Sequence, residues 1–217
     1  MLVTANLAAQ IYQKLRQELM AGRYVPGQKL KLRDLADELG VSVTPVREAL
    51  GRLVSEQALT QIDRRSVSVA VMDLARFDEV RDLRLELEGR AAEQAAAMAT
   101  AADIDGLRDI HARLMDARAR GCHADILLEN EQFHLTLCQL ARRPMLLRLV
   151  ELLWLQCGPL MHGMTFVPVK QPRRHPHSAV ISALRARDGT LAREAIQRDI
   201  QMSTGALRAY LAARAGG

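Results

Sequence analysis

Arginine and hydroxyl side chains in the first third of the sequence have the types and spacing needed to bind a polyanion. Ser42 and Thr44 lie just before Arg47, at the expected start of a helix. A helix N-terminus with two hydroxyls suits a phosphate, and an arginine placed there can donate two hydrogen bonds to a guanine edge. Arg64 and Arg65 form a second basic group, at a turn between two short apolar segments. This chemistry is typical of a surface that contacts double-stranded DNA in its grooves and along its backbone.

A second candidate group lies in the C-terminal part of the chain. Asn130 and His134 are four residues apart, so on a helix their side chains share one face. The surrounding segment, about residues 124–141, has a broad apolar side, which predicts a helix packed into a core. A single histidine in such a core is usually a hydrogen-bonded structural residue, so this spacing alone does not indicate a ligand site.

The elements that must position the first group follow from the apolar pattern. Three segments repeat apolar residues every three or four positions and a fourth alternates, which predicts three helices and a β-hairpin. This is the plan of a winged helix-turn-helix. For any single arginine a solvated surface position is the simpler interpretation, but the whole arrangement favours DNA binding. The expected helices cover residues 7–19, 32–39 and 43–56, with stops at Gly22 and Gly40, and the expected strands cover 59–62 and 66–71.

Charge and composition divide the chain near residue 72. The 217 residues carry 30 basic and 25 acidic side chains, a formal net charge of +5. Residues 1–33 hold six basic residues and a single acidic one, whereas residues 73–217 are nearly balanced in charge. We therefore expect a mainly α protein, with a winged helix-turn-helix domain over residues 1–72 and an all-helical bundle over residues 73–217.

The same composition argues against several classes of protein. Aromatic residues make up 3% of the chain, which is too few for the stacking platforms of single-strand binders. Charged or polar residues interrupt every long apolar stretch, and the N-terminus has no signal-peptide pattern. The three cysteines have no CxxC spacing, which is typical of a reducing compartment. We expect a cytoplasmic protein without a membrane segment.

Segments of the first domain resemble the signature of the gntR family of transcriptional regulators, namely residues 26–30 (PGQKL) and 41–50 (VSVTPVREAL). The resemblance spans roughly residues 5–72. It implies that Arg33, Thr44 and Arg47 contact operator DNA.

Two positions depart from that family pattern. Val43 stands where the family commonly has arginine, and Ser66 stands where it has a glycine at the wing tip. A missing arginine removes one guanine contact worth about 1–3 kcal/mol of discrimination. The operator sequence of relatives therefore cannot be transferred to this chain.

The second domain resembles the FadR-type all-helical effector domain called FCD, over about residues 75–212. The resemblance rests on Arg84–Glu88 (RLELE), on Phe133-His134 and on His177 with its apolar followers. It implies a divalent metal held by one aspartate and three histidines, here at Asn130, His134, His177 and Asp199. Asn130 replaces the family's aspartate and Asp199 replaces a histidine. This exchange either keeps a carboxylate on the other side of the same cavity or marks a lineage without metal.

The mixed nitrogen and oxygen set suits zinc, nickel or manganese-like ions better than copper(I). The other histidines do not match the motif: His111, His123, His162 and His175. Arg84 has two interpretations. It binds the carboxylate of a small organic acid, the kind of ligand that the resemblance implies, or it pairs with Glu88 four residues on, on a solvated face.

The expected function is that of a homodimeric DNA-binding regulator, in this family more often a repressor, whose helical domain binds a small carboxylate metabolite. Its partners are double-stranded operator DNA and that metabolite. Two alternatives stay open: a metal-dependent enzyme built in the bundle, and a metal-free regulator that responds to acyl-CoA. The sequence has no HExxH, GxSxG or phosphate-binding loop, which disfavours the enzyme.

Overall fold

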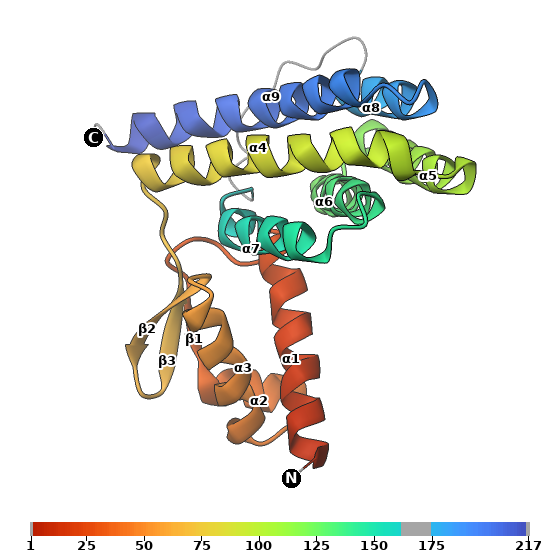
Figure 1. The fold of residues 1–217 in the computed structure, drawn as a ribbon. Helices are drawn as coiled ribbons and strands as arrows, with labels where there is room; N and C mark the ends of the chain where they lie inside the picture. Colours follow the sequence, from red (N-terminus) through yellow and green to blue (C-terminus); the bar gives the residue numbers. More distant parts are fainter. Residues whose placement is uncertain (1, 162–174, 216–217) are drawn as a thin grey trace. The chain divides into compact units, whose positions relative to one another are not determined.

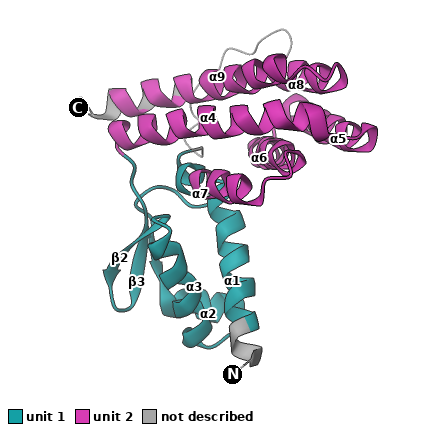
Figure 2. Cartoon of the chain, viewed as in Figure 1, with its two compact units in different colours: residues 1–72, 155–162 teal, residues 73–154, 163–217 magenta. Residues whose placement is uncertain are grey.

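The computed structural model describes residues 2–161 and 175–215, which form helices and one small sheet (Figure 1). The chain divides into two compact units (Figure 2). The first contains residues up to Met72 and the part of helix α7 from Leu155 onward; the second contains the other described residues. Among the described helices, none is long and apolar enough to cross a membrane.

The first unit is a winged helix-turn-helix, as the apolar pattern predicts. Its three strands are antiparallel in the order β1-β3-β2. The sequence analysis missed strand β1 because it has only three residues and its partner, β3, lies far along the chain. The elements are α1 (Leu2–Met20), β1 (Lys29–Lys31), α2 (Leu32–Leu39), α3 (Val43–Ser55), β2 (Leu59–Asp63) and β3 (Ser66–Val69).

The turn between α2 and α3 depends on a glycine. Gly40 ends α2 with a φ of 65°, a left-handed conformation that costs other residues free energy. Ser42 is the N-cap residue of α3, and its side chain makes no capping hydrogen bond, which leaves the hydroxyl available at the surface. Val46 and Leu50 bury the inner face of α3, so that its opposite face is presented to solvent.

The second unit is all-helical, also as expected. Helices α4 and α9 run side by side in opposite directions (Figure 1), and α5, α6 and α8 pack with them around an apolar core. A capping box between Thr100 and Asp103 begins α5. The helices are α4 (Leu74–Met98), α5 (Ala101–Arg120), α6 (His123–Leu140), α7 (Pro144–Met161), α8 (Pro176–Arg185) and α9 (Gly189–Ala215).

Helix α7 differs from the expected division of the chain, which placed all of it in the second domain. Its last part packs in the first unit, where Gly158 lies against the end of α1. A Cβ atom at Gly158 would lie 2.5 Å from the carbonyl oxygen of Leu19, so this approach requires glycine. Such a contact between distant segments has no local sequence signal.

Candidate functional site: a basic surface on the winged helix and a buried histidine cluster

The winged helix presents Arg47 and the wing to one hollow in its surface. The hollow has a volume of about 650 Å³ and is lined by Arg47 of α3 and by Arg64 of the turn between β2 and β3. Arg47 is exposed, and among the described residues it forms no ion pair. The remaining lining residues are Leu32, Leu50, Gly51, Gln61, Asp63 and Val67.

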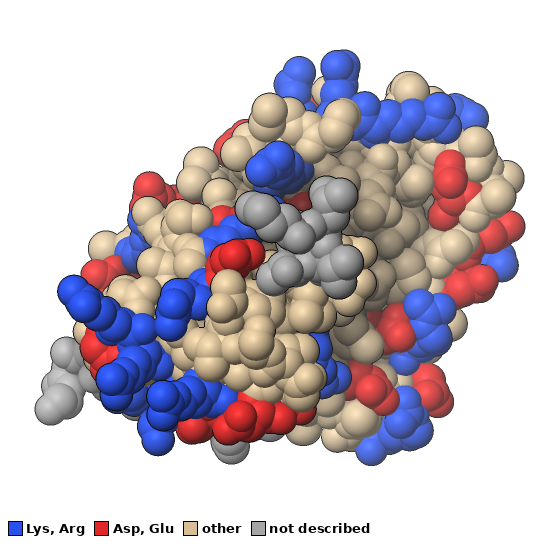
Figure 3. All heavy atoms as spheres, turned by 90° about the horizontal axis from the view of Figure 1, so that it is seen from below, with Lys and Arg blue, Asp and Glu red and all other residues tan. Residues whose placement is uncertain are grey.

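A neighbouring hollow of about 490 Å³ gathers basic side chains from three elements. Arg33 of α2 lines it together with Arg64 and Arg65. Lys29 and Lys31 of β1 line it too, although the sequence analysis did not single them out. Their signal is the alternation of two lysines around Leu30, which is buried while both lysines are exposed. Figure 3 shows Lys and Arg side chains gathered at the left of one face of the molecule.

Side-chain hydrogen bonds hold the wing turn. The Asp63 carboxylate accepts hydrogen bonds from the Ser66 hydroxyl and from the backbone N–H of Arg65, both at 2.7 Å. These hydrogen bonds, that of Ser66 foremost, lower the pKa of Asp63. Ser66, which stands where the family has glycine, therefore has a structural role: it orients the turn that carries Arg64 and Arg65.

The exposed face of α3 has a second arginine, and its surroundings differ from those of Arg47. The guanidinium of Arg52 lies 3.7 Å from the ring centroid of Tyr12. Its Nε also donates to Glu56 at 3.3 Å. Arg52 is thus engaged within the first unit, whereas Ser42, Thr44 and Arg47 point to solvent from the N-terminal turn of α3.

The second unit buries a chain of charged side chains. Arg84 Nε donates to Glu88 Oε1 at 2.6 Å, and Glu88 Oε2 lies 2.5 Å from His134 Nδ1. His134 Nε2 lies 3.0 Å from Asp199 Oδ2. All four residues are at most 5% exposed, and they come from helices α4, α6 and α9. The carboxylates hold the His134 ring from both sides.

His177 completes this group. Its Nε2 lies 3.6 Å from Asp199 Oδ2, and its ring stacks on Phe133 with centroids 3.6 Å apart. Both ring nitrogens are buried without a hydrogen-bond partner among the described residues. Because buried polar atoms are nearly always satisfied, these nitrogens indicate a place for a ligand.

The charges in this group stabilise one another. Burial raises the pKa of Glu88, but the charges of Arg84 and His134 outweigh that effect and lower it to about 2. Burial lowers the pKa of His134, yet the Glu88 charge and the hydrogen bond to Asp199 raise it to about 9. Burial likewise opposes ionisation of Asp199, and the imidazoles of His177 and His134 outweigh it and lower the pKa of that carboxyl. Without a metal ion, the two carboxylates thus favour the protonated form of His134, and metal binding through Nε2 would release that proton.

Ligand atoms of His134, His177 and Asp199 all lie within 4.8 Å of one another. Zinc binds imidazole nitrogen and carboxylate oxygen at about 2.0–2.2 Å. Asp199 Oδ2 lies 3.0 Å from His134 Nε2 and 3.6 Å from His177 Nε2, and two ligand atoms of one such ion can be this far apart. A carboxylate on the far nitrogen of a ligating histidine is the usual supporting contact, and Glu88 makes it to His134 Nδ1. The residues present therefore fit a divalent metal.

Asn130 is not joined to these three residues. It lies half-buried one turn before His134 on α6, and no hydrogen bond or ion pair of the described residues connects it to His134, His177 or Asp199. A divalent ion at this place would therefore have two imidazoles and one carboxylate as ligands, and the Asn130 amide stays the sequence-based candidate for a fourth ligand.

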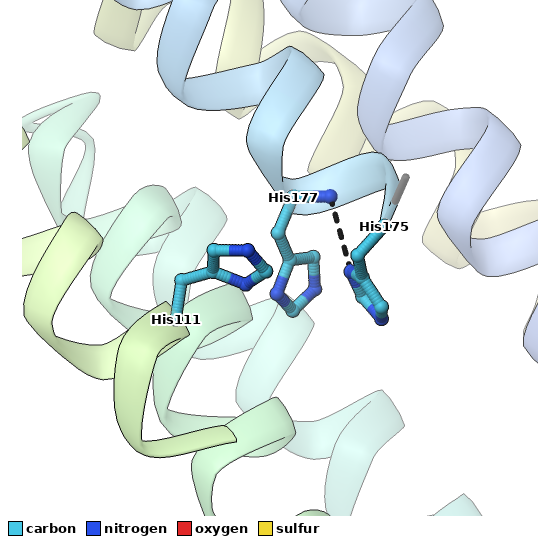
Figure 4. Close-up of side chains that lie close together, drawn as sticks. All are labelled: His111, His175 and His177. Carbon is cyan, nitrogen blue, oxygen red and sulfur yellow. Dashed lines mark hydrogen bonds between the residues drawn. The ribbon is translucent and has the colours of Figure 1, made fainter. Parts of the chain in front are cut away.

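The structure brings two further histidines to the site that the motif comparison did not include. His111 of α5 and His175 at the start of α8 lie with their rings 5.5 Å apart, and each is within 5.7 Å of the His177 ring (Figure 4). Pro176 holds the His175 backbone extended, as expected. That conformation makes His175 the N-cap residue, which brings its ring back beside His177. His123 is exposed, and His162 lies outside the described residues.

Arg84 combines parts of both sequence interpretations. It pairs with Glu88 four residues on, but the pair is buried, since Arg84 is 2% exposed. Its guanidinium lies 4.1 Å from the ring centroid of Trp154. A guanidinium between Glu88 and an indole is held by the protein itself, which leaves it poorly placed to bind a ligand carboxylate.

Comparisons with known proteins agree with both halves of this description. Residues 7–69 match the family described as bacterial regulatory proteins, gntR family, and residues 79–202 match the FCD domain. The HTH-type transcriptional regulator McbR of Escherichia coli is 32% identical over 186 residues, 84% of each chain. The HTH-type transcriptional repressor RspR of Escherichia coli is 28% identical over 202 residues, 91% of this chain and 87% of RspR.

Solved structures show the same fold over nearly the whole chain. The structure of E. coli McbR/YncC has a TM-score of 0.88 at 30% identity, covering 94% of this chain and 98% of that one. A gntR-type structure from Rhodococcus sp. RHA1 has a TM-score of 0.74 at 19% identity and supports the fold alone. These relatives are regulators, which rules against the enzyme alternative. The chain therefore belongs to the gntR family of bacterial transcriptional regulators and carries an FCD domain after its winged helix.

Proposed function

We propose that this regulator acts as a homodimeric repressor in the cytoplasm. Two winged helices would bind a two-fold operator, since half-site symmetry mirrors that of a dimer. RspR, a relative over most of the chain, is named a repressor. The proposed contacts to double-stranded DNA come from the exposed residues Arg33, Ser42, Thr44, Arg47, Arg64 and Arg65, with Lys29 and Lys31 as added phosphate contacts.

The helical unit, in this proposal, binds a small carboxylate metabolite with the help of a divalent ion. The observation that carries it is the convergence of His134, His177 and Asp199 in an apolar core, together with the two unsatisfied nitrogens of His177. When bound, the ion would act as a Lewis acid toward a carboxylate oxygen. Glu88 would orient His134, and Phe133 would hold the plane of the His177 ring.

Ligand binding would regulate DNA affinity only if ligand and DNA prefer different arrangements of the protein. The expected behaviour is a carboxylate-dependent change in operator affinity that requires the ion. This reciprocity also means that operator DNA changes the affinity for the carboxylate by the same factor.

Metal content tests the ligand set directly. Wild-type protein purified in the presence of Zn²⁺, Ni²⁺ or Mn²⁺ should hold about one ion per chain by elemental analysis, and the His134→Ala/His177→Ala double variant should hold none. His123→Ala, at an exposed histidine, is the matched control and should keep the ion. A wild-type protein without bound metal under these conditions would overturn the metal part. A thermal shift caused by acyl-CoA in such a metal-free protein would instead favour the acyl-CoA-responsive alternative.

A further inference from the structure

A glycine lies on the exposed face of helix α3. Gly51 follows Arg47 by four residues, so the two positions share one face of the helix. Gly51 is exposed, lies in the helix interior and does not have a positive φ. Glycine is among the least favourable residues in a helix interior, and alanine is the most favourable. A glycine here therefore lowers stability unless something requires a position without a side chain.

The packing of the first unit does not require glycine at this position. Apart from the chain neighbours and the adjacent helix backbone, no atom of the described residues lies within 4 Å of a Cβ atom placed at Gly51. Gly158 shows the contrast, because a Cβ atom there would lie 2.5 Å from the carbonyl oxygen of Leu19. A reason for glycine at position 51 therefore lies in what approaches this face from outside the chain.

Gly51 lines the hollow of about 650 Å³ between α3 and the wing. Arg47 lines this hollow from α3 and Arg64 lines it from the wing turn, and both are exposed. Asp63 is its acidic lining residue, and the Asp63 carboxylate is already hydrogen-bonded within the wing turn. Two guanidinium groups beside a position without a side chain suit the close approach of a phosphate backbone.

The shape of duplex DNA indicates which part of it would lie at this hollow. In a helix-turn-helix protein the recognition helix, here α3, enters the major groove. Neighbouring grooves of a duplex are separated by one sugar–phosphate strand. With α3 in the major groove, a strand that borders the groove would pass between the helix and the wing, along the side on which Gly51 lies.

We propose that Gly51 is a DNA-contact residue, whose missing side chain lets one sugar–phosphate strand of the operator lie against the backbone of α3 between Arg47 and Arg64. This inference rests on the proposed function and adds to it a contact without a charged or hydroxyl group. The two arginines attract the strand, and Gly51 determines how closely the strand approaches them. A side chain at position 51 would hold the strand away from both guanidinium groups.

Substitutions of increasing size at position 51 test this role. Gly51→Ala adds one methyl group, and Gly51→Leu adds a longer side chain that is also favourable in a helix. Gly106→Ala is the matched control, because Gly106 is an exposed helical glycine with the same open space at its Cβ position, but on α5 in the second unit. Each full-length protein is titrated at fixed salt by fluorescence anisotropy, with an operator fragment selected by the wild type and with an unrelated duplex of equal length. Urea denaturation measures stability in parallel.

Binding and stability are expected to change in opposite directions. Gly51→Ala should raise the urea midpoint, because alanine favours the helix. It should weaken operator binding at least about fivefold, and Gly51→Leu at least about twentyfold, because the phosphates move away from charged hydrogen-bond donors. The unrelated duplex should lose affinity by a similar factor, since contacts to the strand do not depend on the base sequence. Gly106→Ala should raise the midpoint and keep wild-type affinity for both duplexes.

Four outcomes would overturn this role. Wild-type affinity in both Gly51 variants would leave the other proposed DNA contacts standing without Gly51. A lowered urea midpoint in Gly51→Ala would show that the fold itself requires the glycine. Loss of affinity for the operator alone would make position 51 a contact to a base edge and not to the strand. A wild type that binds neither duplex would overturn the proposed DNA contacts as well.

Discussion

The charged residues of the two candidate sites lie in opposite environments, one exposed to solvent and one buried. In the winged helix the candidate DNA contacts lie at the surface between residues 29 and 65, and their charges are solvated. In the helical unit the charged residues of the cluster are buried, and they come from α4, α6 and α9. Charges at the surface interact weakly in the free protein and become important when DNA arrives. Buried charges interact strongly in the folded protein with or without a ligand. These interactions must offset the hydration that the charges lose on burial.

This difference implies that mutations should separate into two kinds. A change on the winged helix should alter DNA affinity and leave stability nearly unchanged. A change in the buried cluster should alter the stability of the protein, and the altered stability should in turn change ligand binding.

The largest effect is expected when the buried ion pair is broken. Glu88→Gln leaves Arg84 without its carboxylate partner and should lower the free energy of unfolding by about 3–5 kcal/mol. Urea denaturation followed by circular dichroism measures this. Glu86→Gln is the matched control on the same helix, because Glu86 forms its ion pair at the protein surface, with Oε2 2.8 Å from Arg193 Nη2. Equal losses in the two variants would mean that burial does not distinguish the pairs.

In protein freed of metal by EDTA, the pH dependence of stability should show the titration of the His134 ring. Its pKa is about 9 in the folded protein against 6.5 for the unperturbed group. The folded state therefore holds this proton more tightly, and the contribution is complete below pH 6.5 and lost as the pH rises through 9. The loss amounts to about 3 kcal/mol. His134→Gln should remove this alkaline loss, and an unchanged pH profile in that variant would contradict the assignment.

On the acid side, other groups of the cluster are expected to act. Burial lowers the pKa of His175 to about 3 and that of His177 to about 4. As the pH falls below 6.5, both rings take up protons in the unfolded chain but stay neutral in the folded protein. Protonation therefore favours the unfolded chain, and the contribution of the neutral rings to stability is lost as the pH falls. Glu88, with a pKa of about 2 against 4.5, loses its contribution as the pH falls from 4.5 toward 2. Metal-free protein should therefore be most stable near pH 6.5, as urea denaturation over pH 3–10 would measure.

The smallest change in free energy is expected on the winged helix. Arg47→Ala should weaken operator binding by about 1–3 kcal/mol, the value of one bidentate contact to a base, without a change in the urea midpoint. Fluorescence anisotropy at fixed salt, with an operator fragment selected by the wild-type protein, measures this. Arg52→Ala is the control on the same helix and should bind DNA nearly as the wild type does, because Tyr12 and Glu56 already hold Arg52. Equal losses in both variants would show that the two arginines share the contact.

Local patterns in the sequence were sufficient for the winged helix. The apolar spacing, the glycine at position 40 and the alternation over residues 66–69 act within a few residues of one another, and the elements they predict are present. Strand β1 was missed because its three residues become a strand only by pairing with β3. Ser66 departs from the family pattern, and only the structure shows the hydrogen bond from Ser66 to Asp63 that accounts for this departure.

The buried cluster could be predicted only in part. Family motif positions identified His134, His177 and Asp199, because each lies in a helix with a recognisable pattern. His111 and His175 had no such signal, since what matters for them is the packing of α5 against α8. The partners of Arg84 were also ambiguous: spacing of four residues predicts the pair with Glu88 but not whether the pair is exposed or buried.

By itself, the sequence determined the two-domain architecture of a gntR regulator and identified the arginines proposed to face DNA, because helix periodicity, turn residues and surface charge are local properties. The tertiary structure alone decided that Arg84, Glu88, His134 and Asp199 form one buried chain of charges. The physical reason is that burial and hydrogen bonding between distant helices set the protonation of these groups, and neither is encoded in the spacing of residues along one helix.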